Sequence, residues 1–369
     1  MFCAAVFFYY YYIITVEDAY RVRKILLKTA AAFCLAAVML SGCGPENTDM
    51  TEDSSTASSA EEKTAEDGRI ILDSVPKNRV KKKPPVKTAF DYDEEGRIVT
   101  DYGRHMPEPE NPTAKNGCVN GQAVYLNPDW RYAYESLINS GYAVMYTAPS
   151  DRNNIIICVN AGHGTSGSYS AYTYCHPDHT PKVTGGTTSA GSLTAVSVSS
   201  GMTMSDGVTE ADVNLAVALT LKDLLLDAGY DVLMIRESSD VQLDNVARTV
   251  IANNMADCHI AIHLDGDGLP YDKGAFYMSV PDGIKYLDNV AASWQASEAL
   301  GDCLIAGLSS AGVSIFGGGA MDMDLTQTSY SSIPSVDIEL GNQSSDHSEG
   351  SIYRWAAGLL TGINMYYGF

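Results

Sequence analysis

The chain has 369 residues, which allows one large or two ordinary domains, and its hydrophobic content of 45% is enough for a sizeable core. Its formal net charge is −21 at pH 7, so the chain repels nucleic acid and anionic surfaces. The charge therefore excludes a protein that binds polyanions through electrostatic attraction, and we expect no nucleic acid among its partners.

The first 42 residues have the form of a secretory signal. The stretch "RVRKILLKTAAAFCLAAVMLSGC" has a basic start, an apolar run over about 29–40 and small residues before Cys43. Its end, "LSGC", resembles the lipobox of bacterial lipoproteins, which implies lipidation of Cys43, a membrane anchor and an outward-facing, extracytoplasmic protein. The alternatives are an ordinary signal peptide or a short anchor, although the apolar run is short for a membrane span. An apolar block over 1–20 precedes the basic region, which favours a translation start near Val22 over an additional membrane segment.

Residues 43–90 have the composition of a disordered linker. The stretch "TEDSSTASSAEEKTAEDG" is polar, acidic and free of aromatic residues. The basic stretch "RVKKKPPVK" that follows is interpreted as an extended tether rather than a membrane or wall contact. Residues 91–150 form an accessory region in which "NPDWRYAYESLINSG" predicts a short helix from Asn127 or Asp129 to Gly141.

Residues 151–369 alternate between strand and helix patterns. The helix over "TEADVNLAVALTLKDLLLDAG" begins with Thr209 as its cap and ends at Gly229. Further helices are predicted over "LDNVARTVIANNMA", "LDNVAASWQASEALGDCLIAGLSSAG" and "SIYRWAAGLLTGINMYYG". Strands are predicted over "NIIICVN", "YDVLMIR", "DCHIAIHLDG", "GAFYMSV" and "IPSVDIELGN". This order predicts an α/β fold with a mainly parallel, twisted sheet and helices on both faces, in three layers.

The cysteines after Cys43 form no disulfide framework, because their number is odd and their spacing irregular. Buried free thiols are expected for most of them, and a bridge between Cys118 and Cys175 is the alternative for that pair.

Four candidate functional residues stand at or near the carboxyl ends of predicted strands, where open α/β sheets bind ligands. His163 follows the first strand, Glu210 opens a long helix, and His263 and Glu339 each end a strand. Two imidazoles and one carboxylate leave a fourth position open on a catalytic zinc ion, and a further carboxylate nearby supplies a general base. Any one of these residues alone also has a common structural use, such as complementing a helix dipole.

A second arrangement of metal ligands is excluded on spacing. His259 and His263 are four residues apart, as in the helical H-E-x-x-H motif, but Ile260 stands in the place of the catalytic glutamate. The segment alternates like a strand, which separates the two imidazoles by roughly 13 Å. His263 is therefore kept as a candidate ligand, and His259 is interpreted as a strand residue.

Four stretches together resemble a known family. "IIICVNAGHGTSG", "TEADVNLAVALTLKDLLLDAGYDVLMIRESSD", "VARTVIANNMADCHIAIHLDG" and "IPSVDIELGNQSSD" occur in the order of the zinc-dependent N-acetylmuramoyl-L-alanine amidases of type 3, which cut the bond between glycan and stem peptide in bacterial walls. The resemblance covers roughly residues 154–369. It implies one zinc ion (Zn2+) held by His163, Glu210 and His263, Glu339 as the catalytic glutamate, and peptidoglycan as the substrate. A zinc peptidase acting within the stem and a non-catalytic wall-binding regulator remain alternatives.

Near the first ligand, several residues have expected supporting roles. Asn160 stands where the family often has Asp, and we expect it to orient His163 through the second ring nitrogen. Gly162 and Gly164 are expected to allow a tight turn and to leave room for substrate. Arg236, Arg248 and Asn253 match recurring positions of the family that look structural.

An insertion over 168–208 separates the first two ligands by far more than is usual in that family. It is rich in Ser, Thr and Gly, and two interpretations stay open: a lid or substrate-shaping loop at the cleft, or a surface elaboration. His176 and His179 within it are not expected to bind a metal ion.

Overall fold

The computed structural model describes residues 91–92, 98–99 and 108–369. The predicted signal segment, the lipidation site Cys43 and the linker over 43–90 lie outside the described residues. Within the part that is described, no helix combines the length and the apolar character needed to cross a membrane.

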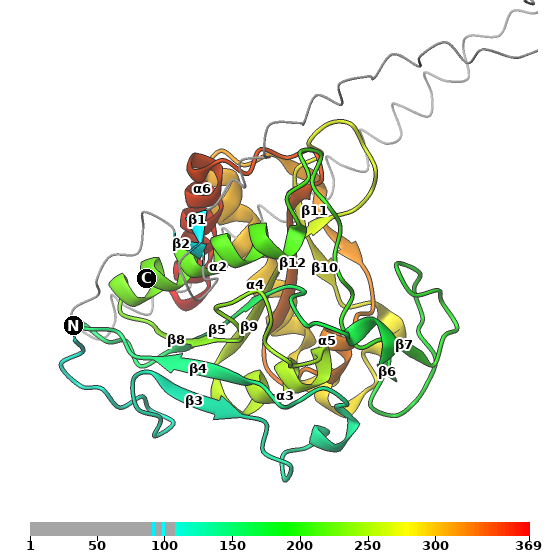
Figure 1. Cartoon of the computed structure of the whole chain (residues 1–369), viewed down its shortest axis with the longest axis horizontal. Coiled ribbons are helices and arrows are strands. Elements are labelled where there is room, and N and C mark those ends of the chain that lie inside the picture. The colour runs from blue at the N-terminus through cyan, green and yellow to red at the C-terminus, as the bar shows by residue number, and fades with distance from the viewer. Residues whose placement is uncertain (1–90, 93–97, 100–107) are drawn as a thin grey trace, which may run out of the picture. The chain divides into compact units, whose positions relative to one another are not determined.

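An eight-stranded sheet forms the centre of the molecule (Figure 1), with the strand order β11-β10-β12-β9-β5-β8-β4-β3. Its strands are β3 (Gln122–Tyr125), β4 (Tyr142–Tyr146), β5 (Ile156–Ala161), β8 (Asp231–Met234), β9 (Cys258–Asp265), β10 (Ala275–Ser279), β11 (Ile315–Asp322) and β12 (Ser335–Asn342). The central strands β12, β9, β5 and β8 run parallel to one another, whereas β10 lies antiparallel to β12 and β4 antiparallel to β8. Two small ladders complete the strands, β1 (Asp91–Tyr92) with β2 (Ile98–Val99) and β6 (Tyr172–Tyr174) with β7 (Thr194–Val196).

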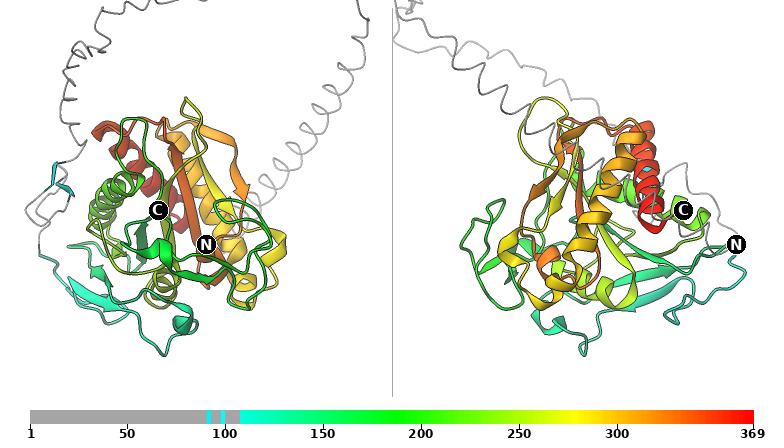
Figure 2. Two further views of the ribbon diagram at one scale, coloured as in Figure 1. Left: turned by 45° about the vertical axis from the view of Figure 1, so that its right-hand side comes forward. Right: turned by 180° about the vertical axis from the view of Figure 1, so that it is seen from behind.

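Helices cover both faces of the sheet, as the views from two further sides show (Figure 2). They are α2 (Glu210–Asp227), α3 (Asn245–Met255), α4 (Asp288–Ser310), α5 (Thr326–Tyr330) and α6 (Glu349–Tyr367). The core of one face is shared by α2, α4 and α6, and α3 packs on the other. The predicted cap of α2 is present, because the side chain of Thr209 accepts a hydrogen bond from the backbone N–H of Asp212. The α/β fold with a mainly parallel sheet between helices is thus confirmed.

Side chains of the central strands alternate between the two faces, and this alternation places the candidate site. Ile260 and Ile262 of β9 belong to the core beneath α2, α4 and α6, and so do Val336 and Ile338 of β12. The residues that alternate with them, including His263 of β9, therefore point to the face covered by α3. Polar residues of three adjacent strands are collected there.

Residues before the first central strand depart from one sequence expectation. The helix expected over 127–141 is only a single 3-10 turn, η1 (Ala133–Glu135). The backbone amides of Leu137 and Ile138 instead donate to the carboxylate of buried Asp244, at 2.7 and 2.9 Å. A competing acceptor thus ends the turn, while β3 and β4 of the same region extend the main sheet. Cys118 and Cys175 are buried free thiols, so the bridge between them is not formed.

Candidate active site

Three predicted ligands converge at the carboxyl ends of β5 and β9. Nε2 of His163 lies 2.8 Å from Oε1 of Glu210 and 3.1 Å from Nδ1 of His263. Nδ1 of His263 lies 3.1 Å from the same Glu210 oxygen. Within residues 108–369, this is the one group of His, Cys, Asp or Glu side chains close enough to hold a metal ion. Two imidazole nitrogens and one carboxylate oxygen match the donor set that zinc prefers, so these residues fit that ion.

The loop that carries His163 is held by two buried arginines. His163 has a φ of 65°, a left-handed conformation that a side chain adopts only when its surroundings enforce it. Arg248 donates to the backbone oxygen of His163 at 2.6 Å, and Arg236 donates to that of Gly162 at 2.8 Å. Both guanidinium groups also donate to the oxygen of Ala161. The structural role expected of these arginines is to fix the backbone beneath the first ligand.

Gly162 makes room for the imidazole of His263 rather than for substrate. A Cβ atom at this position would lie 2.2 Å from Cε1 and 2.4 Å from Nε2 of His263, which is far inside contact distance. The expectation that Gly162 leaves space for the substrate is thus corrected, because the imidazole of His263 fills that space.

The second ring nitrogen of His163 bonds to the insertion and not to Asn160. Nδ1 of His163 lies 2.8 Å from the backbone oxygen of Ser199. Asn160 faces the α3 side of the sheet, where it bonds to His259 at 3.2 Å and accepts from Arg248 at 3.1 Å. The expected role of Asn160 in orienting His163 is therefore wrong.

Glu210 is held from both sides as the first residue of α2. Its Oε2 accepts from the backbone N–H of Met202 at 3.0 Å, and its Oε1 accepts from Leu264 N–H at 3.1 Å. Burial acts to raise the pKa of Glu210, but the imidazoles of His163 and His263 outweigh it and hold that pKa well below its ordinary value. Glu210 is thus a carboxylate ready to bind a cation.

Glu339 lies beside the three ligands on the neighbouring strand. Residues 339 and 263 are register partners in the parallel pair of β12 and β9. The side chain of Glu339 is buried, and its Oε2 has no hydrogen-bond partner among residues 108–369. Burial raises the pKa of Glu339 well above its ordinary value. A carboxyl group with a raised pKa and a free oxygen is suited to accept a proton during catalysis.

A cleft of about 680 Å³ opens over these residues, and it is lined by His163, Glu210, His263, Asp337 and Glu339. One wall comes from the 168–208 insertion, which contributes Lys182 and the stretch 198–202 among others. Buried Asp324 ties this wall to the segment before α5. The insertion therefore shapes the cleft, which favours the first of the two interpretations left open by the sequence.

His176 and His179 are both paired with carboxylates away from the ligand group. His176 Nε2 lies 3.0 Å from Asp324, and His179 Nε2 lies 2.8 Å from Glu135. These pairs connect the insertion to the segment before α5 and to η1.

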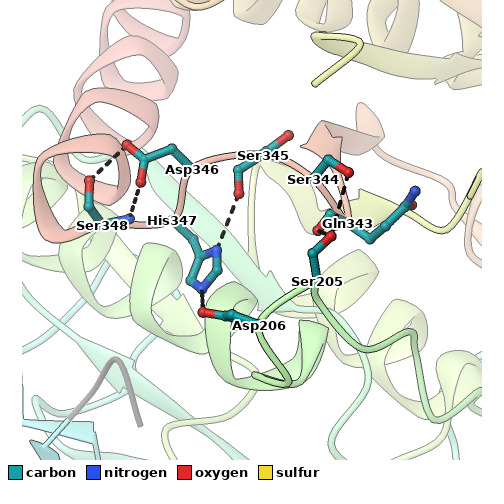
Figure 3. A pocket seen from close by; sticks show the side chains of 8 residues that line it. All are labelled: Ser205, Asp206, Gln343, Ser344, Ser345, Asp346, His347 and Ser348. Carbon is teal, nitrogen blue, oxygen red and sulfur yellow. Dashed lines mark hydrogen bonds and ion pairs between the residues drawn. The ribbon is translucent and has the colours of Figure 1, made fainter. Parts of the chain in front are cut away.

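A second, polar depression of about 310 Å³ lies between Ser205 and the start of α6 (Figure 3). His347 bridges there from the backbone oxygen of Ser345 to the carboxylate of Asp206, at 3.2 and 3.0 Å. Asp346 accepts from the backbone and hydroxyl of Ser348. These groups satisfy one another at the helix start, so the depression has a structural explanation.

Comparisons with known proteins agree with the geometry. The model of a family described as N-acetylmuramoyl-L-alanine amidase matches residues 157–352, which is more than half of the chain. The chain belongs to this amidase family. Its activity is hydrolysis of the amide bond between N-acetylmuramic acid and L-alanine in peptidoglycan.

Solved structures similar to the amidase chain include three N-acetylmuramoyl-L-alanine amidases. Ami1 from Mycobacterium smegmatis is 20% identical over 59% of this chain and 99% of its own, with a TM-score of 0.49. The enzyme from Clostridium difficile 630 is 16% identical over 59% of this chain and 98% of its own, with a TM-score of 0.43. The catalytic domain of CwlV from Bacillus (Paenibacillus) polymyxa var. colistinus is 20% identical over 58% of this chain and 98% of its own, with a TM-score of 0.41. A search of curated proteins found no match.

Three groups of the amidase site were not foreseen from the sequence. The oxygen of Ser199 and the amide of Met202 belong to backbone, which leaves no signal in residue type. Asp337 also lines the cleft, and it lies on the same face of β12 as Glu339, two residues before it. The alternation of "DIE" was a signal for Asp337, since residues two apart on a strand point the same way.

Proposed function

We propose that this amidase works with one zinc ion held by His163, Glu210 and His263, and that Glu339 is its general base. The observation that carries the proposal is the approach of three donor atoms, all within 3.1 Å of one another, beside a buried carboxyl group. When bound, zinc would lower the pKa of a water molecule and stabilise negative charge on the substrate carbonyl oxygen.

The chain's own residues supply the remaining steps. The lactyl carbonyl of the muramic acid enters the cleft beside Glu339, whose free oxygen takes the proton of the attacking water. The same carboxyl group then gives that proton to the departing nitrogen of L-alanine. Burial favours the protonated state of Glu339, which suits the second step.

We also propose that the protein is an outward-facing lipoprotein of the cytoplasmic membrane, anchored through Cys43. The support is the "LSGC" stretch after a basic and apolar segment, followed by a long acidic linker. A lipid anchor would localise an enzyme whose charge of −21 gives it no attraction to an anionic wall. Labelled fatty acid should enter the wild type and not Cys43→Ser, and equal labelling would refute the anchor.

The catalytic proposal is tested on purified peptidoglycan with the full-length protein. The wild type should release peptides that begin with L-alanine. Glu339→Gln should lose activity by at least about 100-fold, because general-base catalysis contributes on that scale, while it still binds one equivalent of zinc. Glu349→Gln, which removes an exposed carboxylate at the start of α6, is the matched control and should keep full activity.

The same digest separates the alternatives by the newly exposed amine. An amine on a later residue of the stem would identify a peptidase, and zinc binding without turnover would identify a regulator. Equal activity of the wild type and Glu339→Gln would refute the role assigned to Glu339.

A further inference from the structure

Asp337 is a buried carboxylate that the proposed reaction does not use. It lies on β12 two residues before Glu339, and it is 5% exposed. Within residues 108–369, its ion-pair partner is His263, with Oδ2 of Asp337 at 3.7 Å from Nε2 of the imidazole. No hydrogen bond to Asp337 is formed by the other described residues. Burying a carboxylate without a partner costs free energy of folding. The position of Asp337 next to His263 therefore needs an explanation.

The two nitrogens of His263 have different surroundings. Nδ1 lies 3.1 Å from both His163 Nε2 and Glu210 Oε1, so Nδ1 is the nitrogen that faces the metal position. An imidazole that binds a metal through Nδ1 carries its proton on Nε2. That N–H points toward the carboxylate of Asp337.

The register of the sheet explains why the carboxylate reaches this nitrogen. Asp337 pairs with Ala261 across β12 and β9, and His263 follows two residues later on the same face. A shortening of about 0.8 Å would bring Oδ2 and Nε2 to ordinary hydrogen-bond distance.

His163 shows the same arrangement with the nitrogens exchanged. Its Nε2 faces the metal position, and its Nδ1 lies 2.8 Å from the backbone oxygen of Ser199. Each imidazole ligand thus has an oxygen acceptor on its far side, a neutral carbonyl for His163 and a carboxylate for His263. Such acceptors fix the tautomer and orientation of a ligand and increase its basicity.

We infer that Asp337 is a positioning residue that orients His263 and strengthens its bond to the zinc ion. The inference rests on the proposed function, because it assumes that zinc binds at this site.

The test compares Asp337→Asn and Asp337→Leu with the wild type in the full-length protein. Zinc affinity is measured by competition with a chelator of known affinity, and thermal unfolding is measured without metal. Asn keeps an oxygen acceptor but no charge, and Leu keeps neither. We expect zinc to bind about 10-fold more weakly to the Asn variant and up to about 100-fold more weakly to the Leu variant.

The metal-free unfolding temperature should move differently from the zinc affinity. Replacement of Asp337 removes one partner of its buried pair with His263, so both variants should unfold earlier than the wild type without metal, whereas the zinc affinity should separate the Asn variant from the Leu variant. Asp302→Asn is the matched control, because it removes one carboxylate that bonds to the Tyr277 hydroxyl outside the cleft. It should bind zinc as the wild type does.

The outcomes separate this inference from the proposed function. If the wild type binds no zinc, both fail. If the wild type binds zinc and both Asp337 variants bind it equally well, only the positioning role is overturned. Complete loss of zinc from both variants at saturating metal would also overturn it, because Asp337 would then be a ligand itself.

Discussion

The substitution Asp324→Asn tests how the 168–208 insertion is held against the sheet. The carboxylate of Asp324 is fully buried and lies 3.0 Å from His176 Nε2 and 2.9 Å from Lys182 Nζ. It also accepts from the backbone amides of Val183 and Thr184, at 2.6 and 2.9 Å. An asparagine would leave the buried ammonium of Lys182 without a carboxylate partner and turn an NH₂ group toward other donors. Breaking a buried pair in this way costs about 3–5 kcal/mol.

For a domain of this size, that loss lowers the unfolding temperature by roughly 6–20 °C. Hydrogen exchange of the amides in 172–196 should also accelerate, and zinc affinity should fall, because the insertion supplies the oxygen of Ser199 to His163. Asp206→Asn is the control: Asp206 is about half exposed and pairs with His347, so its removal should cost less than about 1 kcal/mol. Equal unfolding temperatures for the two variants would refute the anchoring role of Asp324.

The stability supplied by Asp324 should depend on pH in a defined direction. Burial acts to raise its pKa, but hydrogen bonds from His176, Thr184 and Lys182 hold it well below the ordinary value. A depressed pKa gives stability that is present above the unfolded value, about pH 4, and that is lost as the pH falls below it. The difference in stability between wild type and Asp324→Asn should therefore shrink below pH 4, and a constant difference would contradict the assignment.

Two further predictions concern the loop that carries His163. Gly162→Ala should abolish zinc binding and activity, since its methyl group would overlap the imidazole of His263, and unimpaired zinc binding in this variant would disprove the packing argument. Arg248→Lys should lower the free energy of unfolding by about 2–4 kcal/mol in urea titrations, because one ammonium cannot replace a planar fork that donates to Ala161, His163 and Thr165. An unchanged urea midpoint would show that the fork is not required.

The sequence predicts the fold and the ligand group for a common reason. Apolar runs separated by capped helices specify a parallel sheet, and a parallel sheet brings its strand ends to one edge. Residues as distant in sequence as His163 and His263 therefore meet without any local signal between them. The same rule brings Glu339 to this edge, because it lies in the second half of β12, a strand adjacent to β9.

The other features could not be predicted from the sequence. They depend on backbone atoms or on side chains that are distant in sequence and compete for the same hydrogen bonds. Nothing in the residue type of Ser199 indicates that its carbonyl meets His163. Asn160 was assigned to the wrong partner because its distance along the chain to His163 is short, whereas strand alternation sends it to His259. The helix expected around 127–141 does not form, because backbone amides of this segment donate to Asp244, an acceptor more than 100 residues away.

The insertion over 168–208, which is longer than the corresponding stretch expected for the family, forms part of the amidase site. Its last part contacts two of the three proposed ligands directly, through Ser199 to His163 and through Met202 to Glu210. Its middle is fixed by Asp324, a residue that follows β11 at the far side of the cleft. Because one folded segment both lines the cleft and holds the ligands, a change in the contacts of that wall is expected to alter metal affinity as well as the fit of the stem peptide. A surface elaboration would leave metal affinity untouched, so zinc binding by Asp324→Asn distinguishes the two interpretations.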